Sequence, residues 1–128
     1  MNHKERMVYA WKLYKKHKAG KTMSTKLKKL VFETLTYFPK KQISYVNNNV
    51  WFISNTIFPK GRMIQLNNKI KQIIILSEDI TNLPKEEAKY IITHEISHAT
   101  LNHKKSTKKT EKEAIDYANK ILDEKNPL

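Results

Sequence analysis

The spacing of apolar residues divides this chain into a helical beginning, a β-rich middle and a helical end. Two amphipathic helices are predicted within residues 1–38, because apolar side chains there recur every three or four positions. The first of these helices spans about residues 4–18. Ser24 or Thr25 can cap the second helix, and Pro39 is expected to end it.

Short β-rich runs separated by turn residues follow the second helix. The predicted strands are residues 43–46, 50–57, 63–66 and 70–76. The segments between these runs are rich in Asn or contain Pro and Gly, as is typical of turns, so we expect a small, mostly antiparallel sheet of three or four strands. The run 73–76 has no polar alternation, which predicts a strand that is covered on both faces.

Two further helices are predicted at the end of the chain. The first runs from about Pro84 to about Asn102, with proline and then acidic residues in its first turn. The second begins at Thr110, a candidate N-cap, and its apolar stripe consists of Ala114, Ile115, Ala118, Ile121 and Leu122. Helices on either side of a small sheet predict an α+β fold, and 128 residues without a linker or repeat predict one domain over 1–128.

The charge of the chain is strongly positive and uneven. There are 25 Lys and Arg residues against 12 Asp and Glu residues, which gives a formal net charge of +13. Residues 1–30 hold ten of the basic residues and one acidic residue, so the basic N-terminal part is a candidate contact for nucleic acid or another acidic partner. Solvated lysine-rich faces are also common without such a partner.

Cysteine is absent from the sequence, which excludes disulfides, thiol nucleophiles and cysteine-ligated metals. Lysines interrupt the apolar positions near the start, so neither a signal-peptide core nor a membrane span is predicted. We therefore expect a cytoplasmic protein in which any metal ion is held by histidine and carboxylate.

The strongest chemical signal is the H-E-x-x-H pattern of residues 94–98, which falls inside a predicted helix. Residues four apart share one face of a helix, so the imidazoles of His94 and His98 can bind one Zn²⁺ per chain. Glu95, beside the first imidazole, can then act as general base toward a water molecule. The same five residues also occur by chance in helices that bind no metal.

A catalytic zinc ion generally takes three protein ligands and leaves one position for water, so a further ligand is needed. His103 lies on a different face of the helix and is interpreted as a helix-end residue favoured by the helix dipole. The remaining candidates are Glu111, Glu113 and Asp116 of the last helix. At 100° per residue, Glu111 lies about 20° from the centre of the apolar stripe and Glu113 about 140° from it. Glu111 is therefore favoured, with Glu113 as the alternative, although Thr110 and Glu113 also fit a capping box.

Residues 94–103 and 111–122 together resemble the ImmA/IrrE metallopeptidases, which show H-E-x-G-H followed by E-x-E-A-x-x-F-A-x-x-L-L. The resemblance covers about residues 71–122. It implies a zincin-like fold of gluzincin type, in which Glu111, three residues before Ala114, completes the zinc site. It also implies an endopeptidase with a specific protein substrate, which in that family is a DNA-binding repressor.

Two accessory features of such an enzyme have candidates in the sequence. Tyr90, His103 and Tyr117 are the aromatic or imidazole side chains nearest to the motif, and each is a candidate donor to an anionic intermediate. An extended peptide can bind by adding a strand to a sheet edge, for which residues 50–57 or 70–76 are candidates.

The sequence therefore predicts a zinc-dependent endopeptidase with Glu95 as its catalytic base and His94, His98 and Glu111 as its metal ligands. The alternative is a basic nucleic-acid-binding or adaptor protein in which the H-E-x-x-H segment has no catalytic role. A third interpretation is a zinc hydrolase that acts on substrates other than peptides, because the same activation of water serves other acyl and phosphoryl groups.

Overall fold

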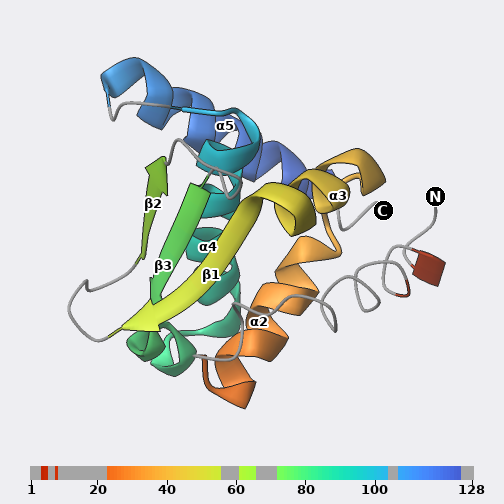
Figure 1. The fold of residues 1–128 in the computed structure, drawn as a ribbon, viewed down its shortest axis with the longest axis vertical. Coiled ribbons are helices and arrows are strands. Elements are labelled where there is room, and N and C mark those ends of the chain that lie inside the picture. The colour runs from red at the N-terminus through yellow and green to blue at the C-terminus, as the bar shows by residue number, and fades with distance from the viewer. Residues whose placement is uncertain are drawn as a thin grey trace.

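The computed structural model describes residues 4, 5, 8, 23–55, 61–65, 72–103 and 107–124. In chain order the elements are α2 (Thr25–Leu35), α3 (Lys40–Asn49), β1 (Val50–Asn55), β2 (Gly61–Gln65), β3 (Gln72–Ser77), the short 3-10 helix η2 (Glu78–Asn82), α4 (Lys85–Thr100) and α5 (Lys108–Glu124) (Figure 1). The described residues thus form an α+β arrangement, as predicted. The first predicted helix, 4–18, lies outside the described residues except for three helical positions.

Helix α2 is set by its cap and by one apolar face. The hydroxyl of Ser24 accepts a hydrogen bond from the backbone N–H of Leu27 at 3.1 Å, so Ser24 is the N-cap of this helix. Leu27, Val31 and Leu35 lie at helical spacing and are all buried. The helix ends at Leu35, so Pro39 does not terminate it but serves as the N-cap residue of α3.

Helix α3 replaces the strand predicted over residues 43–46, and that prediction is wrong. Ile43 and Val46 are buried and are three residues apart, which places both side chains on one face of a helix. The β-branched composition of the run favoured a strand, but burial of this face against the core outweighs that local preference.

The sheet has three strands in the order β1-β3-β2, and it is mixed. β1 pairs with β3 in parallel, with Phe52 opposite Ile74, whereas β2 pairs with β3 antiparallel, with Met63 opposite the same residue. The prediction of a mostly antiparallel sheet therefore fails for one of the two pairings. Ile75 of β3 is buried as well as Ile74, although successive side chains of a strand point to opposite faces. The prediction that this central strand is covered on both faces is therefore confirmed.

Helix α4 is the central element of the fold. It contacts α2, α3, β2, β3, η2 and α5, and in Figure 1 it lies behind the sheet while α5 crosses the end of the sheet. Ile92 and Ile96 of α4 have no exposed surface and belong to one hydrophobic cluster with Leu27 of α2 and Ile74 of β3. The chemical motif of the sequence is therefore carried by the helix that the rest of the described chain holds most firmly.

Helix α5 uses a narrower apolar stripe than the sequence suggested. Ala114, Ala118 and Ile121 are buried, but Ile115 is 39% exposed. The stripe therefore follows positions three and four apart through Glu111, Ala114 and Ala118, which brings the side of α5 bearing Glu111 against α4. Within the described ranges, no helix has the length and apolar character needed to cross a bilayer.

Candidate metal centre

The H-E-x-x-H residues lie in the second half of α4, on the part of the helix that faces α5. α4 begins after Pro84 with Glu86 and Glu87 in its first turn, as the helix dipole favours. Its C-terminal half packs against the sheet through Ile96 and Ala99, which are both completely buried. The polar face of this half is consequently turned toward the first turns of α5.

Three side chains from these two helices converge on one point. Nε2 of His94 and Nε2 of His98 are 3.2 Å apart, and each also lies close to the carboxylate of Glu111. Oε2 of Glu111 is 3.2 Å from Nε2 of His94, and Oε1 is 3.1 Å from Nε2 of His98. The structure therefore brings together the three residues that the sequence predicts as metal ligands, and their binding of a metal stays a prediction.

The geometry of the cluster fits a small divalent cation. Ligand atoms at about 2.0–2.1 Å from a tetrahedral zinc ion lie about 3.3 Å from one another, close to the observed separations. One ligand atom from each of the three residues lies within 4.8 Å of the other two. Two imidazoles and one carboxylate are also a donor set that catalytic zinc sites use. Nδ1 of His94 is buried and has no hydrogen-bond partner among the described residues, so Nε2, toward Glu111, is the outward-facing nitrogen of this ring.

The alternative ligand, Glu113, is directed elsewhere. Its Oε2 lies 3.3 Å from Nε2 of His103, on the side of His98 away from Glu111. The capping box predicted for Glu113 is also wrong, because α5 begins three residues earlier than expected. The hydroxyl of Thr107 accepts from the backbone N–H of Thr110 at 3.1 Å, so Thr107 caps α5. Asp116, the third candidate, is exposed on α5.

Glu95 lies beside the cluster in a desolvated position. Burial, together with the negative charge of Glu111, raises the pKa of the Glu95 carboxyl from 4.5 to about 7. Its residue surface is 9% exposed. A carboxyl group with a pKa near neutrality can both accept and release a proton, which is what a general base that later acts as an acid must do.

Burial also acts on the imidazole of His98. It lowers the pKa of this ring below its ordinary value, more strongly than the nearby carboxylate of Glu111 raises it. The neutral ring is the form that binds a metal ion, since a protonated imidazole has no free lone pair.

The candidate donors to an anionic intermediate have different surroundings. The ring of Tyr117 packs against Phe38, with centroids 6.2 Å apart, and His103 is engaged with His98 and Glu113. The ring of Tyr90 lies 6.1 Å from that of His94 and is the candidate nearest to the cluster.

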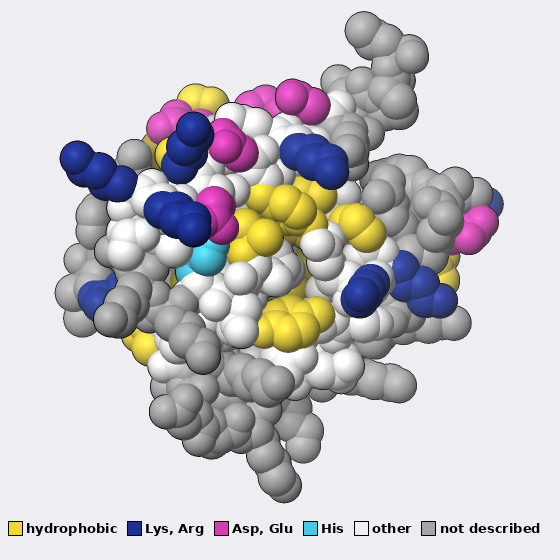
Figure 2. Space-filling view, turned by 90° about the horizontal axis from the view of Figure 1, so that it is seen from above, with side chains coloured by type: hydrophobic (Ala, Val, Ile, Leu, Met, Phe, Trp, Pro, Cys, Tyr) yellow, Lys and Arg dark blue, Asp and Glu magenta, His cyan; other side chains and the backbone are white. Residues whose placement is uncertain are grey.

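The cluster lies at the surface on one side and in the protein on the other. The side chain of Glu111 is 42% exposed, whereas that of His98 is 9% exposed. Figure 2 shows a histidine side chain at the surface next to an acidic and a basic side chain. Of the two strands suggested as a rim for a peptide, 70–76 is excluded because β3 is central, which leaves β1 and β2 as the edges of the described sheet.

Two glutamines of the sheet support the site, and the sequence analysis missed both. The side-chain amide of Gln72 donates to the carbonyl oxygen of Ala99 at 2.9 Å, and Tyr45 donates to the Gln72 side-chain oxygen at 3.0 Å. The amide of Gln65 donates to the carbonyl of His103 at 2.7 Å. A signal was present, because Gln72 is a polar residue directly before an otherwise apolar central strand.

No protein-family model matches this sequence, and neither the curated proteins nor the solved structures include a significant match. The resemblance to the ImmA/IrrE metallopeptidases therefore rests on the residues quoted for it.

Proposed function

We propose that this protein is a zinc-dependent hydrolase. The observation that carries the proposal is the convergence of His94, His98 and Glu111 from α4 and α5, with their nearest ligand atoms 3.1–3.2 Å apart. Glu95, next to the cluster, supplies the acid–base group that such an enzyme needs. The order of these residues along the chain further supports a zincin-like fold of gluzincin type.

Within that class, the proposed activity is that of an endopeptidase related to the ImmA/IrrE group. The order of H-E-x-x-H and a downstream Glu three residues before Ala114 supports this choice. The proposed substrate is a specific protein, with a DNA-binding repressor as the first candidate. A cytoplasmic location is part of the same proposal, and a chain without cysteine is compatible with a reducing compartment.

The chain's own residues have distinct tasks in this chemistry. His94, His98 and Glu111 hold the ion through Nε2, Nε2 and the carboxylate. When bound there, Zn²⁺ supplies Lewis-acid polarisation of the scissile carbonyl and lowers the pKa of a water molecule. Glu95 accepts the proton of the attacking water on its carboxylate and passes it to the departing amine. Burial of Glu95 keeps its pKa high enough for both transfers.

Metal content tests the class, and cleavage tests the particular function. Elemental analysis of protein purified without an affinity tag is expected to find about one zinc per chain, and metal-free protein of unchanged stability would refute the proposal. Incubation of wild type and of Glu95→Gln with a lysate of the native host is expected to reveal a protein that only the wild type cuts. Cleavage of model esters or phosphates, with no protein cut, would favour the non-peptidase interpretation.

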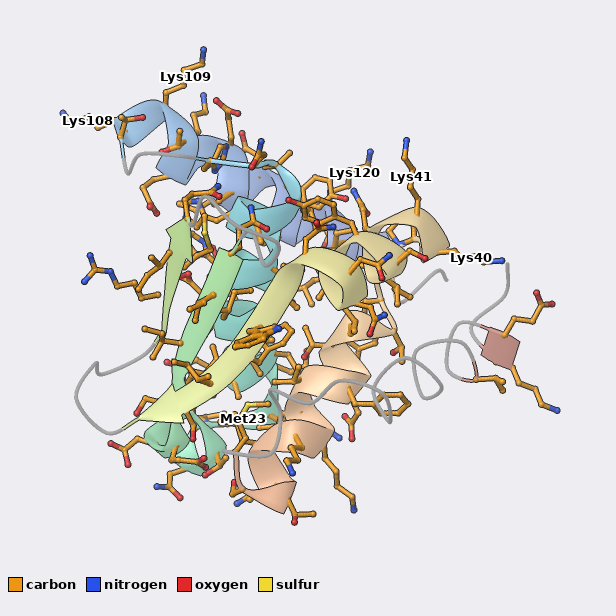
Figure 3. All side chains as sticks on the ribbon, viewed as in Figure 1. Met23, Lys40, Lys41, Lys108, Lys109 and Lys120 are labelled. Carbon is orange, nitrogen blue, oxygen red and sulfur yellow. The ribbon has the colours of Figure 1, made fainter. Side chains whose placement is uncertain are left out.

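The nucleic-acid-binding alternative draws on charge that the described surface does not carry. Thirteen of the 25 basic residues and all twelve acidic residues fall among the described residues, so this part of the chain is nearly neutral. Its lysines extend outward from α3 and α5, as the five labelled in Figure 3 show. A nucleic-acid interface in the basic N-terminal part would lie almost wholly outside the described residues.

A further inference from the structure

A second line of polar side chains lies behind His98, on the side away from Glu111. Nδ1 of His98 is 2.9 Å from Nδ1 of His103, and Nε2 of His103 is 3.3 Å from Oε2 of Glu113. The side chain of His103 is 8% exposed, so this line is shielded from water along most of its length. It joins the end of α4 to the first turns of α5 by a route separate from the zinc cluster.

The turn that ends α4 builds this line. The backbone N–H of His103 donates to the carbonyl of His98 at 3.1 Å, and that of Asn102 donates to the carbonyl of Ala99 at 3.0 Å. These two bonds form a Schellman motif, which requires a left-handed residue at Asn102, and the φ of Asn102 is 57°. The motif folds the chain back so that the ring of His103 meets the ring of His98.

The sheet holds the same turn in place. The amide of Gln65 donates to the carbonyl of His103 at 2.7 Å, and the amide of Gln72 donates to that of Ala99 at 2.9 Å. The backbone of His103 is therefore fixed by the helix end and by the sheet, and its ring position does not depend on the presence of an ion.

Hydrogen-bond chemistry allows one assignment of protons when Nε2 of His98 binds a metal. Nδ1 of His98 must then carry the hydrogen and donate it, so Nδ1 of His103 must accept. His103 consequently carries its own hydrogen on Nε2, which faces the carboxylate of Glu113. Each ring nitrogen of the two histidines then has a role, and the Glu113 carboxylate completes the line as an acceptor.

From this arrangement we propose that His103 and Glu113 are positioning residues that hold His98 in its metal-binding tautomer and orientation. Outer partners of this kind commonly contribute about 10- to 100-fold to metal affinity. The proposal rests on the proposed function, because it requires that His98 binds zinc. It also makes the two imidazoles unequal, since Nδ1 of His94 has no partner among the described residues.

The test measures zinc affinity by competition with a chromogenic chelator in three variants of the full chain. His103→Ala removes the whole line and is expected to weaken zinc binding by about 10- to 100-fold. His103→Asn places an amide oxygen near the former Nδ1 position and is expected to recover part of that loss. Glu113→Gln, which keeps an acceptor without the charge, is expected to have the smallest effect, and the exposed neighbour variant Asp116→Asn is the matched control with none.

A second readout reports on the tautomer directly. In zinc-loaded, ¹⁵N-labelled protein, Nδ1 of His98 is expected to be protonated in wild type, and its N–H signal is expected to exchange faster with water in His103→Ala. A merely structural role of His103 would lower the stability of the metal-free fold without changing this signal.

The outcomes separate the two proposals. Wild-type protein without zinc would refute the proposed function itself. Wild-type protein with one zinc, and unchanged affinity and tautomer signal in His103→Asn and Glu113→Gln, would refute the positioning role alone. If His103→Ala does not fold, as circular dichroism would show, the other two variants decide.

Discussion

Two polar clusters lie on the same helix, α4, and they are balanced in different ways. In the first, the buried ammonium of Lys89 donates to the hydroxyl of Tyr37 and lies 3.5 Å from the carboxylate of Glu33. Burial lowers the pKa of Lys89, but Tyr37, Glu33 and Glu86 outweigh it, and the pKa ends above its ordinary value. This cluster satisfies its own charge with groups from α2 and α4.

The second cluster, further along α4, has an excess of acceptors. Burial and the charge of Glu111 together raise the pKa of Glu95, and two imidazoles converge on Glu111. These rings balance the carboxylate only when they are protonated, and burial lowers the pKa of His98. The first cluster is complete as protein alone, whereas a cation would balance the second, and this difference separates a structural arrangement from a candidate site.

The largest expected effect comes from removing a ligand of the second cluster. His98→Ala and Glu111→Gln are each expected to weaken zinc binding by more than the roughly 100-fold that outer partners contribute, and to abolish hydrolysis. Chelator competition and elemental analysis measure the loss. Asp116→Asn, an exposed acid on the same helix as Glu111, should bind zinc as wild type does, and equal affinity in Glu111→Gln would exclude Glu111 as a ligand.

Replacing the base should separate binding from chemistry. Glu95→Gln keeps the shape of the side chain but cannot accept a proton, so zinc content is expected to stay at one per chain while the cleavage rate falls by about 10²- to 10⁴-fold. Comparison of kcat in metal-loaded samples checks this. Glu87→Gln, at an exposed position of α4, serves as the control, and a fully active Glu95→Gln would remove Glu95 from the mechanism.

The same residue predicts a pH dependence of stability in metal-free protein. The folded-state pKa of Glu95 is about 7 against an ordinary 4.5, so between these values the unfolded chain releases its proton first and the free energy of unfolding falls as pH rises. The loss is complete above about pH 7 and amounts to at most about 3 kcal/mol. Urea unfolding from about pH 4.5 to 8 measures it, and Glu95→Gln should remove this part of the slope. A stability that is flat or rising across that window in both proteins would contradict it.

The smallest effect is expected in the first cluster. Lys89→Met removes a buried hydrogen bond and an ion pair, but Glu33 remains half-exposed and still pairs with Lys85 at 3.2 Å. The expected loss is about 1–2 kcal/mol in the free energy of unfolding, with zinc content unchanged. A loss of zinc in this variant would show that the two clusters are coupled, and the comparison between them would fail.

Local signals in the sequence predicted the helices that carry the site, and non-local ones did not. Ser24 and Pro84 mark the starts of α2 and α4 because a cap and a first-turn proline act on neighbouring residues. The meeting of His94, His98 and Glu111 was also predictable, since it follows from helical spacing and one shared core.

The errors have a common physical origin. Ile43 has a local preference for strands, but packing against the rest of the chain makes it helical. The parallel pairing of β1 with β3 depends on which strand is buried most, which only the assembled sheet decides. Gln65 and Gln72 likewise acquire their partners at the end of α4 from the sheet, and spacing along α4 alone contains no trace of them.

The bonds from Gln65 and Gln72 to the end of α4 have a consequence for motion. Helix termini commonly fray and exchange their amide hydrogens ahead of the middle, because their last carbonyls lack partners. Here the carbonyls of Ala99 and His103 are bonded to two different strands, so the last turn of α4 should exchange at the slow rate of the core. The two imidazoles would then start from a nearly rigid platform, and little ordering would be left for an incoming ion to impose.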